Sequence, residues 1–299
     1  MKITAIVVIN DYPKHVEESI DSVITHVDEL IIGDINMKYK IPNKYSEKNI
    51  KVIKLDESIP YADLIKEDLK EKANGEYIFY FDPDEVIPGS TWKILEKKSK
   101  SYDYFLIPRK NIIFNKWIKN SRWWPDYQIR FFKKNKVIWP KKLHPKPKVN
   151  GKEYKIEAKE KLAIIHYNYE NLSQYFEKAL RYSKSEAEQI IKQGEDLSLS
   201  NTIVKALSEF VSRFYAAEGY KDGMHGFVLA FLQMFYYFFV YFFYWEKKSY
   251  IEVNSDRLNK DIYLFFKDGL RNVTYWLINK KLVKKYQSIK LKFLNRLLK

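Results

Sequence analysis

Short apolar runs alternate with amphipathic helical patterns over the first 85 residues. The apolar runs lie at residues 3–9, 29–33, 50–55 and 76–81, and the helical patterns lie at residues 16–27 and 61–73. Runs rich in β-branched residues are typical of buried parallel strands, and apolar residues at helical spacing indicate helices that cover a sheet. The sequence therefore predicts an α/β fold that begins with a mostly parallel sheet.

The run at residues 76–81 ends in three carboxylates, Asp82, Asp84 and Glu85. Because charge is costly to bury, carboxylates at the mouth of a core strand need a cation, a basic partner or water. Mg²⁺ and Mn²⁺ prefer carboxylate oxygens, and Mg²⁺ often bridges a carboxylate to substrate phosphates. Asn10 and Asp34 also follow predicted strands, so they share the sheet edge at which α/β proteins bind ligands. These residues alone fit either a metal–diphosphate site or a solvated acidic turn.

The composition narrows the function classes. The chain has 299 residues and no cysteine, which excludes disulfides, thiolate metal sites and cysteine nucleophiles. A net charge of +15 favours a polyanionic partner, whether nucleic acid, an anionic membrane surface or a phosphorylated substrate. The basic residues are spread along the chain and no nucleic-acid motif is present, so nucleic acid is not expected. The first apolar run is too short for a typical signal peptide, which predicts a cytoplasmic protein.

The pattern becomes helical after residue 170, which predicts a sheet domain over 1–168 and a helical region over 169–299. Phe227–Trp245 has Gln233 as its one strongly polar residue and is rich in Phe and Tyr. Four placements remain open for it: packing against the preceding helices, a homo-oligomer contact, the membrane interface and a membrane span. Residues 279–299 carry Lys and Arg, no acid and one apolar face. That pattern suits a peripheral contact with an anionic membrane at its inner face.

Several ordered segments resemble family 2 glycosyltransferases of the GT-A fold, especially the lipopolysaccharide-core glucosyltransferase-like branch. The matching segments are 7–11 (VVIND), 27–34 (VDELIIGD), 75–85 (GEYIFYFDPDE), 124–132 (WPDYQIRFF), 143–144 (LH), 165–167 (IHY) and 220–227 (YKDGMHGF). Each segment is weak alone, whereas the ordered set over residues 1–245 is specific. The resemblance implies a GT-A (Rossmann-like) sheet domain, a nucleotide-sugar donor and Mg²⁺ or Mn²⁺ as cofactor.

The resemblance also implies roles for individual residues. Asp126 matches the general base, and Asp82 and Asp84 match the acidic metal motif, with Asp84 the favoured ligand. The residues expected to contact the nucleotide sugar are Asn10, Asp11, Asp34, Asp82 and Arg130. His166 is expected to be a further metal ligand. The residues expected on the acceptor side are Glu85, Trp123, Trp124 and His144. Each residue also has an ordinary structural alternative, such as a helix N-cap, a turn, an ion pair or core packing.

The implied activity is an inverting, metal-dependent transfer of a hexose from a UDP-sugar to a glycan, lipid-linked or other cell-surface acceptor. The cation stabilises the departing diphosphate, and one base takes the acceptor proton. The sequence departs from the family pattern in three places: directly after Asp34, around Tyr61, and at Pro145, which follows a histidine. They leave the donor open, and they allow a catalytically inactive glycan-binding relative. A nucleic-acid-binding protein is the alternative from another class.

Overall fold

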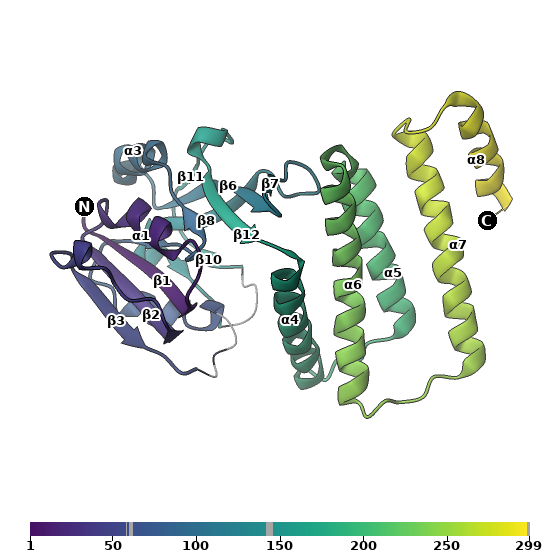
Figure 1. Cartoon of the computed structure of the whole chain (residues 1–299), viewed down its shortest axis with the longest axis horizontal. Coiled ribbons are helices and arrows are strands. Elements are labelled where there is room, and N and C mark those ends of the chain that lie inside the picture. Colours follow the sequence, from purple (N-terminus) through teal and green to yellow (C-terminus); the bar gives the residue numbers. More distant parts are fainter. Residues whose placement is uncertain (58, 60–61, 142–145, 298–299) are drawn as a thin grey trace. The chain divides into compact units, whose positions relative to one another are not determined.

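The computed structural model describes residues 1–57, 59, 62–141 and 146–297 (Figure 1). The chain divides into two compact units. The first contains Met1–Trp117 and Trp124–Asn168, and the second contains Ile118–Trp123 and Tyr169–Lys299. Residues 118–123 therefore group with the helical unit, whereas the boundary expected from sequence puts them in the first domain.

The first unit is a sheet with helices on its faces. Its main elements are β1 (Ile3–Asp11), α1 (Val16–Ile24), β2 (Glu29–Met37), β3 (Ile50–Lys54), α2 (Lys66–Glu71), β4 (Tyr77–Tyr80), β5 (Glu85–Val86), α3 (Gly89–Lys98), β6 (Tyr104–Ile113), β7 (Lys116–Trp117), β8 (Asp126–Lys133), β9 (Val137–Ile138), β10 (Lys148–Val149), β11 (Glu153–Lys155) and β12 (Ile164–Tyr169). The helix expected over 61–73 is shorter, because a 3₁₀ turn at Ala62–Leu64 precedes α2.

The strands of the first half form a parallel sheet in the order β3-β2-β1-β4. β8 then pairs antiparallel with both β4 and β6, and the sheet continues to β12 and β5. The predicted α/β class, with a Rossmann-like parallel half before a helical region, is confirmed. The strand order reverses between β1 and β4, which is the switch point where open α/β sheets bind ligands.

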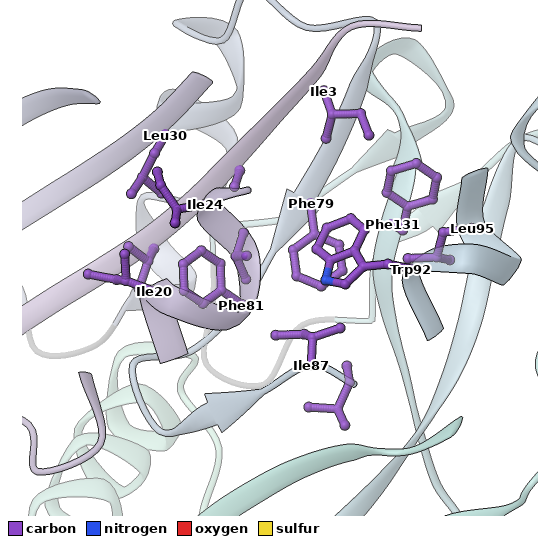
Figure 2. Close-up of a cluster of buried hydrophobic side chains, with 14 of the residues drawn as sticks. Ile3, Ile20, Ile24, Leu30, Phe79, Phe81, Ile87, Trp92, Leu95 and Phe131 are labelled. Atoms are coloured by element: carbon purple, nitrogen blue, oxygen red, sulfur yellow. The ribbon is translucent and has the colours of Figure 1, made fainter. Parts of the chain in front are cut away.

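Apolar cores cover both faces of the sheet, because side chains of a strand alternate between faces. Ile3, Ala5, Val7 and Ile9 of β1 lie in the cluster that includes α1 and α3, whereas Ile6 lies in the cluster that includes α2. Figure 2 shows the first cluster, where Phe79 of β4 lies against Trp92 of α3 with ring centroids 4.6 Å apart. Burial on both faces explains why the strand sequences are nearly continuous apolar runs.

The second unit is helical. It contains α4 (Leu172–Lys192), α5 (Leu199–Val211), α6 (Met224–Lys247), α7 (Ser255–Asn279) and α8 (Lys285–Leu297). α6 packs against α4 and α5, and α7 packs against α5 and α8. α7 lies inside the helical region predicted over 169–299, but no helical pattern within 255–279 is singled out from the sequence. Half of its twelve large apolar residues are exposed and none is buried, so its pattern lacks a buried stripe, although Asn254 caps its first turn.

Within the described residues, α6 is the one helix that could cross a membrane by length and composition, with mean hydropathy 1.8 over its most apolar window. One third of that window is buried. Gly226 allows α6 to approach Gly219 closely, since an added Cβ would lie 1.8 Å from the Gly219 carbonyl oxygen. Packing against the preceding helices therefore accounts for one face of α6, while Phe231 and Phe242 stay exposed.

Candidate functional site

Strand ends bring polar side chains together at one edge of the sheet. β1 and β4 are parallel, and β8 runs antiparallel to both β4 and β6. The carboxyl ends of β1, β4 and β6 therefore meet the amino end of β8. Asn10, Asp11 and Asp82 lie at the ends of β1 and β4, Asp126 begins β8, and Arg109 and Asn111 lie within β6, where Arg109 pairs with Asp126. This edge is the switch-point edge, and Asp126 reaches it because β8 starts there.

Two arginines hold the acidic turn after β4. Arg130 Nη2 donates to Asp82 Oδ2 and to Glu85 Oε1, the latter at 2.6 Å. Arg109 Nη1 donates to the same Glu85 oxygen at 3.0 Å. Glu85 is fully buried, and its Oε2 accepts from the backbone N–H of Asp82 at 3.1 Å. The expected acceptor-side position of Glu85 does not suit this burial, and the residue serves instead as an internal counter-ion for both arginines.

The ion pairs keep Asp82 charged. Burial alone would raise the pKa of Asp82, but the positive charges of Arg130, Lys66 and Arg109 outweigh burial and hold that pKa below its ordinary value. Desolvation alone would lower the pKa of Arg130, but Asp82 and Glu85 raise it. A metal ion at Asp82 would compete with a guanidinium that is already in place. The geometry therefore favours Asp84 over Asp82 as a metal ligand.

Replacing Arg130 by Met is expected to destabilise the first unit by about 3–5 kcal/mol at neutral pH. The fully buried Glu85 loses one of its two guanidinium partners, and Asp82 loses its pairing with Arg130. The pKa of Asp82 is depressed in the folded state, so pairing stabilises the fold above the unfolded pKa of about 3.9. That contribution is lost as pH falls through the lower folded pKa. In the variant Asp82 loses the charge of Arg130 and protonates more easily, so the difference from wild type should shrink on acidification.

Urea unfolding at neutral pH and at about pH 3, below the unfolded pKa of aspartate, measures both effects. The matched control is Lys97→Met on the exposed surface of α3, where a change within about 0.5 kcal/mol is expected. An Arg130→Met variant that is as stable as wild type, or equally destabilised at both pH values, would contradict a buried ion-pair role.

Asp126 begins β8, and its two carboxylate oxygens are used unequally. Oδ2 accepts from Arg109 Nε at 2.8 Å, lies 2.7 Å from Arg109 Nη2, and accepts from Asn111 at 3.1 Å. Oδ1 accepts from Gln128 at 2.7 Å. Because a carboxylate oxygen can accept two hydrogen bonds, Oδ1 can also accept from a hydroxyl group. The side chain of Asp126 is 23% exposed, so such a hydroxyl has access.

Burial alone would raise the pKa of Asp126, but the charge of Arg109 and the hydrogen bonds from Asn111, Arg109 and Gln128 lower it overall. Asp126 is therefore ionised at neutral pH and can accept a proton. The same interactions make it a weaker base than an ordinary aspartate. They also fix its orientation, which an acceptor hydroxyl requires.

β12 brings His166 beside Asp84. His166 Nδ1 lies 2.6 Å from Asn111 Oδ1, and the Asn111 amide nitrogen points to Asp126. An amide oxygen can only accept, so Nδ1 carries the proton and Nε2 has the lone pair in the neutral ring. Nε2 lies 3.7 Å from Asp84 Oδ1. Two ligands at about 2.1 Å from one ion lie at most about 4.2 Å apart, so this pair fits a single cation.

The residues fit a metal that a substrate helps to hold. In the part of the chain that the structure describes, no three His, Asp or Glu side chains form a metal site by themselves. Mg²⁺, however, is often held by one or two carboxylates together with substrate phosphates. Asp84 and His166 fit such a shared site. The bond from His166 Nδ1–H to Asn111 is the support that metal-binding histidines commonly have.

The residues expected at the nucleotide lie at β1 and β2. Asn10 and Asp11 are exposed where the register of β1 with β2 shifts. Asp11 has φ 58°, and its carboxylate pairs with Lys38 at 2.8 Å. Asp34 does not end its strand as the sequence suggests, because β2 continues to Met37. Its Oδ1 accepts from the Met37 N–H at 2.6 Å, so the carboxylate also stabilises the end of β2.

The two tryptophans predicted on the acceptor side belong to different units. Trp123 belongs to the second unit, where the guanidinium of Arg213 lies 5.9 Å from its ring centroid. Trp124 belongs to the first unit and meets Trp117 edge-on with ring centroids 5.2 Å apart. His144 lies outside the described residues. Neighbouring tryptophans in the sequence therefore belong to different units.

Sequence reasoning misses Arg109, Asn111 and Gln128. Arg109 is a charged residue directly after an apolar run, which is the same signal that selects Asp82, so the edge argument could have found it. Asn111 and Gln128 are single polar residues within or beside strands, and nothing in their spacing distinguishes them from ordinary surface positions. Their role depends on the pairing of β6 with β8, which brings Arg109 opposite Asp126.

No family model and no curated protein sequence matches the chain. Among solved structures it is similar to S. aureus TarS 1–349, with 14% identity, a TM-score of 0.42, and coverage of 92% of this chain and 80% of that chain. It is also similar to TarS 1–349 in complex with UDP-GlcNAc, with 15% identity, a TM-score of 0.43, and coverage of 78% of this chain and 81% of that chain. A third similar structure is the mannosyltransferase PcManGT from Pyrobaculum calidifontis in complex with GDP-Man and Mn²⁺. It has 11% identity and a TM-score of 0.46, and the match covers 82% of this chain and 88% of that chain.

Proposed function

We propose that the chain is a glycosyltransferase that moves a hexose from a nucleotide sugar, with a UDP-sugar as the expected donor. The observation that supports this most is the meeting of Asp84, His166 and Asp126 at the switch-point edge of a Rossmann-like sheet. A cation ligand pair and an oriented carboxylate are the two groups that transfer from a diphosphate requires.

On the donor side, Asp84 and His166 would hold Mg²⁺ or Mn²⁺ together with the diphosphate. The bound ion would stabilise the negative charge of the departing diphosphate. Asn10, Asp11 and Asp34 are proposed contacts of the base or ribose, since they lie on β1 and β2 beside the switch point. Arg130 is proposed to act through Asp82, because its guanidinium already pairs with that carboxylate.

On the acceptor side, Asp126 Oδ1 would take the proton of the attacking hydroxyl. The bond between the acceptor oxygen and the sugar carbon forms as the bond from that carbon to the phosphate oxygen breaks. A single displacement inverts the sugar carbon and needs one base and no covalent intermediate. The acceptor is proposed to be a glycan, lipid-linked or other cell-surface molecule, with Trp124, which lies in the same unit as Asp126, as a surface for stacking on sugar rings.

Thermal unfolding in the presence of nucleotide sugars, with and without Mn²⁺, tests this proposal. A ligand at 100 times its Kd stabilises the folded state by about 2.7 kcal/mol, which raises Tm by several degrees. We expect such a rise for one class of nucleotide sugar and only with Mn²⁺.

Other results of this screen would favour the alternatives. A glycan-binding relative without catalytic activity would be stabilised by free glycans and not by nucleotide sugars. A nucleic-acid-binding protein would be stabilised by oligonucleotides at physiological salt. Either result, in the absence of a nucleotide-sugar effect, would overturn the proposed function.

A further inference from the structure

The exposed side of α8 is apolar. Tyr286, Ile289, Phe293 and Leu297 are 58%, 64%, 65% and 68% exposed. At about 100° per residue these four side chains fall within an arc of about 80°. Leu291 and Leu294, which point elsewhere on the helix, are only half-exposed. An ordinary surface helix buries its apolar stripe, whereas α8 presents one to solvent.

Basic residues flank this stripe on both sides. Lys285, Lys292 and Arg296 lie along one flank, and Lys290 lies along the other. Residues 279–297 contain no Asp or Glu, so no acidic side chain of α8 or of the turn before it offsets these charges. An apolar stripe between two basic flanks is typical of helices that lie in the plane of a membrane interface.

We propose that this face of α8 docks the chain on an anionic lipid bilayer. The four apolar side chains would enter the boundary between headgroups and acyl chains, and the flanking cations would meet lipid phosphates. This inference does not depend on the glycosyltransferase proposal, because it rests on α8 alone. It would, however, place the chain at the surface where lipid-linked acceptors are found.

Charge complementarity selects the bilayer over other occupants. A second copy of the same face would bring two sets of cations together with no acid between them, which opposes self-association. A nucleic acid would satisfy the cations but would leave the aliphatic and aromatic stripe in water. Anionic lipids satisfy both parts of the surface.

Vesicle flotation of the full chain tests the proposal directly, with vesicles of phosphatidylcholine alone or mixed with phosphatidylglycerol. We expect binding to the anionic vesicles that weakens as salt is raised, and little binding to the neutral ones. Because each basic residue near such a surface contributes about 1 kcal/mol, loss of the two cations alone would weaken binding on the order of 25-fold. Lys285→Glu with Arg296→Glu should weaken it by more than that factor, because the anionic surface also repels the two new carboxylates. Ile289→Asp with Phe293→Asp should weaken it at least as much.

The matched controls lie in the first unit. Ile138 is 54% exposed, so Ile138→Asp repeats the apolar-to-acid change away from α8, and Lys97→Glu with Lys100→Glu repeats the charge change. The controls should bind vesicles like wild type, and all variants should show wild-type circular dichroism and Tm. Absence of vesicle binding, equal binding to neutral vesicles, or binding unaffected by the α8 variants would overturn the proposal. So would a concentration-dependent dimer that Phe293→Asp dissociates.

Discussion

Asp126→Asn is expected to lower the rate of sugar transfer by a factor of about 10²–10⁴ while leaving donor binding unchanged. Asparagine matches aspartate in shape and can keep a bond to Gln128, but it cannot accept a proton. Arg109 would keep Glu85 as a partner, so the fold should survive. The measurement is kcat together with the Kd of the donor.

Two further observations separate a base from a structural carboxylate. The pKa of Asp126 is held below its ordinary value, so its carboxylate remains ionised down to about pH 5. Protonation of Asp126 should therefore cause no loss of rate between neutral pH and about pH 5. Asp68→Asn, which removes an exposed ion pair with Lys141, serves as the control. If Asp126→Asn weakens donor binding and stability as much as it lowers kcat, Asp126 anchors Arg109 and is not the base.

Asp84→Asn is expected to reduce transfer by a factor of about 10²–10³, because a carboxylate bound to the cation contributes several kcal/mol of charge stabilisation through it. The apparent affinity for Mn²⁺ in the presence of nucleoside diphosphate should fall in parallel. Electron paramagnetic resonance of Mn²⁺ measures that affinity without turnover.

His166→Ala provides the companion to this variant. It removes the second proposed ligand and keeps Asp84, so it should also weaken Mn²⁺ binding, while Asp68→Asn should not. Asp82→Asn should weaken it less, because Asp82 is held by Arg130. A larger effect at Asp82 than at Asp84 would reverse the order of the two carboxylates as ligands.

The first half of the fold could be predicted because β1, β2, β3 and β4 are short apolar runs separated by clear helical or polar segments. Local periodicity is sufficient for such elements. The edge rule for parallel strands then placed Asn10 and Asp82 together without any knowledge of distant pairing. These predictions needed only the sequence near each residue.

The remainder depends on pairings between distant segments. Asp126 follows a proline, a position that suits a helix N-cap, and only the antiparallel pairing of β8 with β4 and β6 shows that it starts a strand at the site edge. Glu85 resembles an exposed acid in sequence, yet the two arginines that bury it come from β6 and β8. Long-range ion pairs of this kind leave no local pattern.

The helices of the C-terminal region also differ in how well the sequence alone predicts them. α6 was recognisable because its apolar composition is extreme, whereas α7 mixes charges with exposed aromatics and gives no buried stripe to detect. The grouping of residues 118–123 with the helices depends on contacts such as Asp222 accepting from the backbone N–H of Asn120 at 2.8 Å. Such contacts join segments about a hundred residues apart.

Release of nucleoside diphosphate from a panel of nucleotide sugars is the most direct test of the proposed site. The protein would be assayed with Mn²⁺ and with a chelator, alongside Asp84→Asn and Asp126→Asn. The predicted result is release from one class of nucleotide sugar that requires Mn²⁺ and is lost in both variants. Release that is unchanged by the chelator and by both variants, or no release from any nucleotide sugar, would contradict a metal–diphosphate site at this edge of the sheet.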